Sequence, residues 1–136
     1  MEQKDYLMRE IEKIGTLFRA LVGRLTNSKE DYSLTAESHF EMTKEVLLNE
    51  LGFDLDKYLT LDEESSNIYL LQFKGINPVN MELLAEVMAQ LGRNNLSPEK
   101  SSYYEKALQL YSLCERTDKT FSIVREKKIE EIKNAL

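Results

Sequence analysis

The chain has 136 residues, of which 42% are apolar and 31% are charged, and it contains only five glycines and two prolines. This composition excludes a disordered chain and a loop-rich β protein, and the length suits a single domain over residues 1–136. Eighteen basic against twenty-four acidic residues leave a net charge of −6, which opposes attraction to phosphates. We therefore expect an all-α protein without a nucleic-acid partner.

The cysteine content and the start of the chain bear on localisation. Cys114 is the one cysteine, so no internal disulfide can form, and residues 1–5 lack the basic and then apolar layout of a secretory signal. The longest run without a charged residue, Ser65–Phe73, has nine residues, whereas a membrane-spanning helix needs about 20. These features predict a cytoplasmic protein.

Residues 4–25 carry the strongest helical pattern, with apolar side chains spaced alternately four and three residues apart. About two and a half heptads are too few for a coiled coil, but they present one apolar stripe that needs a cover. We expect the stripe to pack inside its own chain, with a residual symmetric contact that gives a weak homodimer. The stripe consists of Leu7, Ile11, Ile14, Phe18, Leu21 and Leu25.

The middle of the chain, residues 34–75, predicts two helices. The first spans about Leu34–Leu51, where Gly52 provides a C-terminal stop. A short turn over Asp54–Leu59 is expected to follow it.

Thr60 and Glu63 have the spacing of a capping box, in which a hydroxyl and a carboxylate satisfy each other's unpaired backbone NH groups. This spacing predicts a third helix over about Leu61–Gly75. Its inward side chains are expected to include Ile68 and Leu71.

The last part, residues 78–136, contains two strong helix starts. Asn77-Pro78 and Ser97-Pro98 each place a capping side chain before a proline, whose missing NH is no loss at the first helical position. They predict an antiparallel hairpin of helices over Pro78–Leu91 and Pro98–Arg116.

A further helix is expected after this hairpin, capped by Thr117 or Asp118, which gives about six helices in total. No segment shows the sustained alternation of a β-strand. The inward side chains of this last helix are expected to be Phe121, Val124, Ile129 and Ile132.

Residues Tyr103–Leu110 resemble the second helix of a tetratricopeptide repeat, where an aromatic residue precedes Ala-Leu at this spacing, and Leu84–Leu91 is similar to the first. The resemblance covers one repeat, residues 81–114, and departs from the pattern at Met88 and Lys100, where small residues are usual. It implies antiparallel hairpins stacked in a right-handed arrangement, with an N-terminal amphipathic helix added in front.

The whole chain is also similar, more loosely, to an uncharacterised family of small bacterial helical proteins. The similar segments are Asp5–Glu12 and Leu51–Asp56, followed by repeat-like hairpins. This resemblance implies a helical fold and a bacterial cytoplasmic setting, and it carries over no activity.

Many tetratricopeptide proteins bind peptides in a groove lined by the first helices of the repeats. In this chain the resemblance places Ala85 and Ala89 in the groove, and Arg93 and Lys119 are candidates for its rim. One subclass grips a C-terminal carboxylate with Lys and Asn, and the two alanines do not support that grip. A shallow apolar groove for an unknown protein or peptide is the expectation that remains.

No combination of residues predicts catalysis, a metal or a cofactor. His39 has Ala36 three positions before it, so the Glu-x-x-His pattern of a helical di-iron site is absent, and no histidine lies near Cys114 in the sequence. The acidic pairs four residues apart fit solvated helix faces. These pairs are Glu41 with Glu45 and Glu126 with Glu130.

The leading hypothesis is therefore a non-enzymatic protein-interaction or scaffold domain. A peripheral membrane protein is the first alternative, because Ile14–Leu25 carries only Arg19 and Arg24 as charged residues on an apolar helix. The acidic net charge makes that alternative the weaker one. The second alternative is an enzyme whose site is assembled from residues scattered along the chain.

Overall fold

The computed structural model describes residues 2–27, 36–94, 100–119 and 121–136. These ranges contain seven helices and no strand, so the predicted all-α class is confirmed and the expected number of helices was one too low. The helices are α1 (Glu2–Asn27), α2 (Ala36–Leu51), α3 (Leu55–Thr60), α4 (Glu63–Leu70), α5 (Pro78–Arg93), α6 (Lys100–Asp118) and α7 (Ile123–Ala135).

Helix α5 is the centre of the fold, because ten of its sixteen residues are buried. It starts where predicted: the side chain of Asn77 accepts a hydrogen bond from the backbone NH of Asn80 at 2.9 Å, and Pro78 follows the cap. It continues past the predicted end at Leu91, through Gly92 to Arg93. A Cβ atom at Gly92 would lie 2.7 Å from the ring of Tyr104, so this glycine lets α6 approach closely.

Helix α1 lies parallel to α5. The side-chain amide of Asn80 donates to the carbonyl of Ile11 at 3.1 Å, and that of Asn94 donates to the carbonyl of Leu25 at 3.2 Å. In each pair the two residues are 69 positions apart in the sequence. The two helices therefore run in the same direction and keep one register over about 21 Å.

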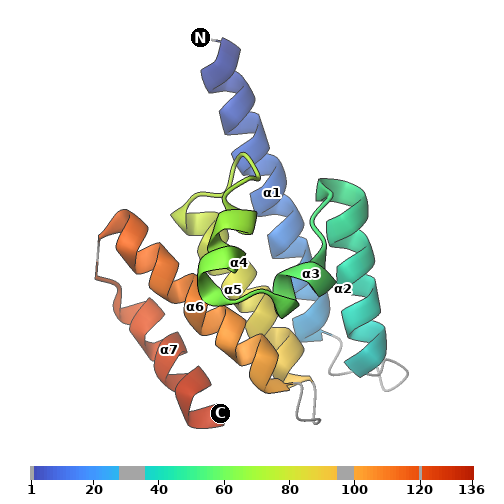
Figure 1. The fold of residues 1–136 in the computed structure, drawn as a ribbon, viewed down its shortest axis with the longest axis vertical. Coiled ribbons are helices and arrows are strands. Elements are labelled where there is room, and N and C mark those ends of the chain that lie inside the picture. Colours follow the sequence, from blue (N-terminus) through green and yellow to red (C-terminus); the bar gives the residue numbers. More distant parts are fainter. Residues whose placement is uncertain (1, 28–35, 95–99, 120) are drawn as a thin grey trace.

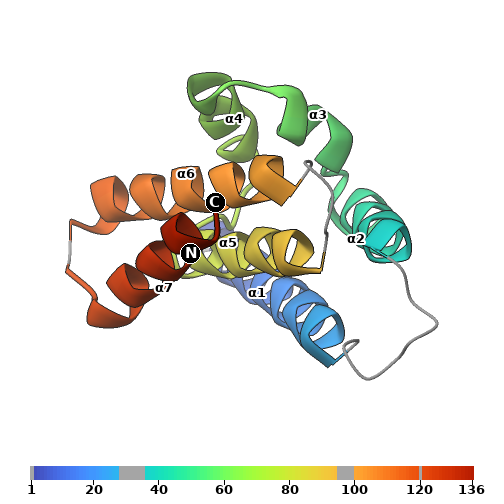
Figure 2. The same cartoon turned by 90° about the horizontal axis from the view of Figure 1, so that it is seen from below.

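Helix α7 runs in the same general direction as α5 but obliquely to it, and Figure 2 shows α7 and α1 on different sides of α5. Glu82 pairs with Arg125 and Glu86 pairs with Lys128, so residue numbers rise together along the two helices. Helix α6 is antiparallel to α5 and packs on it, while α2 contacts α1 and α5, and α3 and α4 contact α6 (Figure 1). The result is one row of three parallel helices, α1, α5 and α7, backed by α2 and α6.

The apolar stripe of α1 is buried within the chain from Ile14 onwards. Ile14, Phe18, Leu21 and Leu25 are each at most 1% exposed. Leu7 is exposed, because the first turns of α1 project beyond the rest of the molecule (Figure 1). The intramolecular part of the prediction is thus confirmed for the larger part of the stripe.

The segment predicted as a turn, Asp54–Leu59, is largely helix α3. The side chain of Asp54 caps it by accepting from the backbone NH of Lys57 at 3.1 Å. Phe53 anchors the segment, since its ring centroid lies 5.2 to 5.4 Å from the rings of Tyr58, Tyr69 and Phe73.

The predicted capping box at Thr60 and Glu63 is wrong. Helix α4 is capped by Asp62, whose side chain accepts from the backbone NH of Ser65 at 2.7 Å. The helix ends at Leu70 rather than at Gly75, and Ile68 is exposed instead of facing the core. Leu71 is also exposed.

Gly75 lies in a turn with φ +95°, and a Cβ atom there would be 2.8 Å from the backbone carbon of Glu10. Glycine therefore serves two needs at this position, the left-handed conformation and the close passage of the turn over α1. This contact fixes the level at which α5 begins relative to α1.

The cap of the last helix is also later than predicted. Ser122 caps α7 by accepting from the backbone NH of Arg125 at 3.2 Å, while Thr117 and Asp118 belong to the last turn of α6. Phe121 and Val124 are exposed, and Ile132 is buried as expected. The predicted helix starts at Leu34 and Pro98 lie outside the described residues.

Candidate functional site

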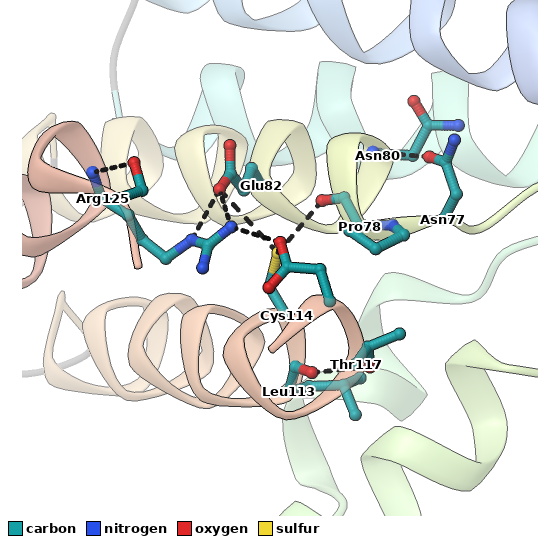
Figure 3. Close-up of polar contacts among 10 residues, drawn as sticks. Asn77, Pro78, Asn80, Glu82, Leu113, Cys114, Thr117 and Arg125 are labelled. Atoms are coloured by element: carbon teal, nitrogen blue, oxygen red, sulfur yellow. Dashed lines mark hydrogen bonds and ion pairs between the residues drawn. The ribbon is translucent and has the colours of Figure 1, made fainter. Parts of the chain in front are cut away.

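A polar cluster joins the three C-terminal helices (Figure 3). Arg125 of α7 donates from Nε to Oε1 of Glu82 on α5 at 2.6 Å and from a terminal nitrogen to Oδ2 of Asp118 on α6 at 2.7 Å. The thiol of Cys114 donates to the carbonyl of Pro78 at 3.3 Å, 3.8 Å from Glu82 Oε1. We call these four side chains, Glu82, Cys114, Asp118 and Arg125, the Arg125 cluster.

The electrostatics of the Arg125 cluster suit a clamp between helices. The side chain of Arg125 is 5% exposed. Burial by itself lowers the pKa of Arg125, but the hydrogen bonds to Asp118 and Glu82 more than offset it and raise that pKa above its usual value. The guanidinium therefore stays charged and bridges two carboxylates from different helices.

The thiol of Cys114 is not activated for nucleophilic chemistry. Burial, the largest cause, raises its pKa to about 12, and the nearby carboxylate of Glu82 adds to the effect against the opposing charge of Arg125. Nucleophilic cysteines require a lowered pKa and access to solvent, whereas this side chain is buried. Cys114 serves as a small core residue whose thiol has the carbonyl of Pro78 as its nearest acceptor.

A second polar cluster holds α3 and α4 against α6. The ammonium group of Lys106 donates to the carbonyl of Leu61 at 2.6 Å, to Oε1 of Gln109 at 3.1 Å and to the hydroxyl of Ser66. It also lies 5.1 Å from the centre of the Tyr58 ring. We call this group the Lys106 cluster.

A lysine beside a serine is a known catalytic pairing, in which the amine takes the serine proton. Burial lowers the pKa of Lys106, as that role would require. However, all three donors of the ammonium group have acceptors, and the hydroxyl of Ser66 lies 3.2 Å from the Leu61 carbonyl, to which it can donate. The side chains of Lys106 and Ser66 are both buried, so their contact holds α4 against α6 and is not open to a substrate.

The four residues predicted to form a groove do not come together. Ala85 and Ala89 are buried in the core, so neither side chain lines an open surface. Their small size instead serves helix packing along α5. The interpretation of these alanines as groove residues does not fit the structure.

The two predicted rim residues lie at opposite ends of the α5–α6 hairpin. Arg93 is in the last turn of α5, 3.7 Å from Glu131 of α7. Lys119 follows the end of α6, where Cys114 and Pro78 show that α6 ends beside the start of α5. Both residues are exposed.

The described residues contain no group of three or more His, Cys, Asp or Glu side chains that could hold a metal ion. His39 is buried in α2, and within the described ranges neither of its ring nitrogens has a hydrogen-bond partner. No helix in the described ranges has the length and apolar character needed to cross a bilayer.

One face of the row of parallel helices carries exposed apolar side chains. Helix α5 points Asn80 at α1, Gly92 at α6 and Glu82 at α7, which leaves Val79 and Leu83 on the remaining side. Val79 is exposed and Leu83 is half-buried.

Two neighbours extend this surface across the row. Met8 lies two turns before Gly15, which faces Asn80, so Met8 is on the α5 side of α1. Val124 lies one turn before Lys128, which pairs with Glu86, so it is on the α5 side of α7. Both are exposed. We call Met8, Val79, Leu83 and Val124 the apolar band.

No protein family, curated protein or solved structure matches the chain. Sequence reasoning missed both polar clusters, because the residues that pair in them are far apart in the sequence. Lys106 and Ser66 are 40 residues apart, and Arg125 and Glu82 are 43 residues apart. Sequence reasoning also missed the apolar band, whose members come from three separate helices.

Proposed function

We propose that the chain is a non-enzymatic interaction domain that binds another protein or a peptide across the apolar band. One observation carries this proposal: the buried polar groups of both clusters use their bonds to hold helices together, whereas the band leaves large apolar side chains in solvent. Exposed apolar side chains gathered across neighbouring helices are typical of protein-binding surfaces.

We further propose a tetratricopeptide-like arrangement in which α1–α2 and α5–α6 are stacked right-handed hairpins. The parallel row of α1, α5 and α7 supports it, since the first helices of successive repeats also lie side by side (Figure 2). In this arrangement α3 and α4 are an insertion and α7 closes the stack. The apolar band then lies on the face formed by first helices.

Site-specific photo-cross-linking tests the proposed surface. Val79 and Ile68 are each 59% exposed, but only Val79 belongs to the apolar band. A photoreactive phenylalanine analogue at residue 79 should give a discrete cross-linked product in cells that make the protein naturally, and the same analogue at residue 68 should not. Equal products at both positions, or none at residue 79, would contradict the proposal.

The membrane alternative needs the apolar side of Ile14–Leu25 to face lipid. Ile14, Phe18 and Leu25 are buried against the chain's own helices, so lipid contact would require α1 to leave the core. An enzyme would need an accessible reactive group, and neither Cys114 nor Ser66 is accessible. We therefore keep the interaction domain as the proposed function.

A further inference from the structure

Helix α7 is held to the rest of the chain mainly by charged contacts. Arg125 binds Glu82 and Asp118, Lys128 lies 2.5 Å from Glu86, and Arg93 lies 3.7 Å from Glu131. Among the described apolar side chains of α7, Ile132 is the one that is fully buried. Ion pairs contribute little net stability compared with apolar burial, so α7 is the helix most easily released.

The connection between α6 and α7 contains a strained residue. Lys119 has φ +55°, the left-handed conformation that a residue with a side chain adopts at a cost. Its backbone NH donates to the carbonyl of Glu115 at 2.9 Å. Helix α7, which begins at Ile123, runs in the opposite direction to α6. Release of α7 from its own α5 and α6 lets Lys119 relax to an ordinary conformation.

Two large apolar side chains beside this connection are left in solvent. Phe121 is 78% exposed, and Ile123 is also exposed. Ile123 lies two residues before Arg125, so it points away from the cluster that Arg125 enters. No described part of the chain covers this pair, which we call the hinge pair.

We propose that two copies of the chain exchange α7 and form a dimer. Each α7 docks on α5 and α6 of the other copy and makes the same contacts that it makes in the monomer, including those of Arg125 and Lys128. The contacts of the docked helix therefore change little between the two forms. The hinge pair is not part of the apolar band, and an exchanged α7 returns Val124 to the equivalent place beside α5 of the other copy. The proposal therefore does not rest on the proposed function.

The second copy is the occupant that the hinge pair fits best. Exchange about a two-fold axis brings the two connections together, so Phe121 and Ile123 of one copy meet the same residues of the other. The dimer gains this contact and the relaxation of Lys119 in both copies. Because the new interface is small, the dimer should form only at high protein concentration.

Cross-linking within a purified dimer distinguishes exchange from simple surface contact. Cysteines replace Glu86 and Lys128, whose side chains meet in the structure, and Cys114→Ser removes the natural thiol. The dimer fraction is isolated by size exclusion and treated with a short bismaleimide. Exchange predicts covalent dimers on a denaturing gel, while the monomer fraction gives internally linked monomers. Internally linked monomers from the dimer fraction, or no dimer at the highest soluble concentration, would overturn the proposal.

Variants of the connection give a second test in the otherwise natural chain. Lys119→Gly removes the strain from the monomer and should lower the dimer association constant about tenfold. Phe121→Ser should lower it by a similar factor, with monomer stability unchanged because the side chain is exposed. Ile68→Ser, an exposed position remote in sequence from the connection, is the matched control and should have no effect. A dimer that is equally stable in all three variants would also overturn the exchange.

Discussion

Helix α5 has two parallel neighbours that are attached by different physical means. On one flank, α1 buries Ile14, Phe18 and Leu25 almost completely. Neutral amide bonds complete that interface: Asn80 donates to the carbonyl of Ile11, and Asn94 donates to that of Leu25. On the other flank, α7 is attached to α5 by three ion pairs. Figure 3 shows one of them, between Arg125 and Glu82.

The difference between the flanks indicates which part of the molecule can move alone. Apolar burial of about 1.5 to 3 kcal/mol per large side chain couples α1 to the whole core, so α1 cannot leave without global unfolding. Ion pairs at a partly exposed interface are screened by salt and depend on the protonation of carboxylates. The α7 flank should therefore open locally, and the conditions of the solution should control how often it does.

The largest expected effect comes from a charge placed in the α1 flank. Ile14→Asp buries an unpaired carboxylate and should cost about 4 kcal/mol or more, enough to unfold most of the protein. Circular dichroism should show the loss of helix, and light scattering should report the mass of any folded remainder. Leu7→Asp is the matched control on the same stripe, and because Leu7 is exposed it should stay folded. If the Ile14→Asp protein is folded, contacts other than those of Ile14 hold α1 on the core.

A smaller effect is expected where the turn at Gly75 passes over α1. Gly75→Ala combines a left-handed backbone with a Cβ atom 2.8 Å from the backbone of Glu10, and should cost about 2 to 4 kcal/mol. Gly52→Ala is the control, because Gly52 also has a positive φ, +72°, but no neighbouring atom within 4 Å. It should cost only about 1 kcal/mol. Urea denaturation gives both values, and equal losses would mean that the close approach to α1 adds nothing.

On the α7 flank, Arg125→Met should release one helix and leave the rest folded. Without the guanidinium, Glu82 and Asp118 have no cation between them, and both carboxylates can hydrate once α7 departs. Hydrogen exchange should become fast in α7 and stay slow in α1, with a loss of about 1 to 2 kcal/mol in the free energy of α7 docking.

The control for this release is Arg116→Met, which removes an exposed pair 3.7 Å from Glu63 and should leave α7 unchanged. High salt should act on the natural protein as Arg125→Met does, only more weakly. Slow exchange in α7 of the Arg125→Met protein would mean that Ile132 and its neighbours hold the helix without the ion pairs.

The flank predicted best from the sequence is the one built from periodic apolar residues. The stripe from Ile14 to Leu25 and the start of α5 at Asn77-Pro78 were both predicted, because a helical period and a cap are local signals. The antiparallel packing of the two hairpin helices was also predicted, and the structure shows the ring of Tyr104 on α6 against Gly92 on α5. These features need only residues within a few turns of one another.

The α7 flank and the middle helices were predicted less well, for two physical reasons. More than one residue near each helix start has a side chain that can cap the helix. Asp62 rather than Thr60 caps α4, and Ser122 rather than Thr117 caps α7, because each lies one residue before the first helical residue. The partners of Arg125 cannot be recognised from its neighbours in sequence, since Glu82 lies 43 residues away. The apolar side chains of this region point outwards because charged groups occupy the interface instead.

The smallest expected effect concerns the carboxyl groups of Glu115 on α6 and Glu126 on α7. The hydrogen bond that the protonated Glu115 carboxyl donates to Glu126, followed by burial and the repulsion between the two groups, raises the pKa of Glu115 above its usual 4.5, although Arg125 acts in the opposite direction. A raised pKa means that the folded chain binds the proton more tightly than the unfolded chain. The stabilisation is therefore present below the unfolded pKa and is lost as the pH rises through the folded one. The contact between α6 and α7 should weaken on going from about pH 4.5 to neutral.

Glu115→Gln keeps an uncharged hydrogen-bonding group at this position whatever the pH, and should therefore remove part of that dependence. The protection of α7 amides, corrected for the intrinsic pH dependence of exchange, should be higher than in the natural protein at neutral pH and the same at low pH. Glu130→Gln is the control, because it removes the same charge at an exposed position of α7. The Arg125 cluster is intact in both variants. A difference between their pH profiles therefore does not come from net charge or from that cluster. Identical pH profiles for the two variants would show that Glu115 and Glu126 do not control the docking of α7.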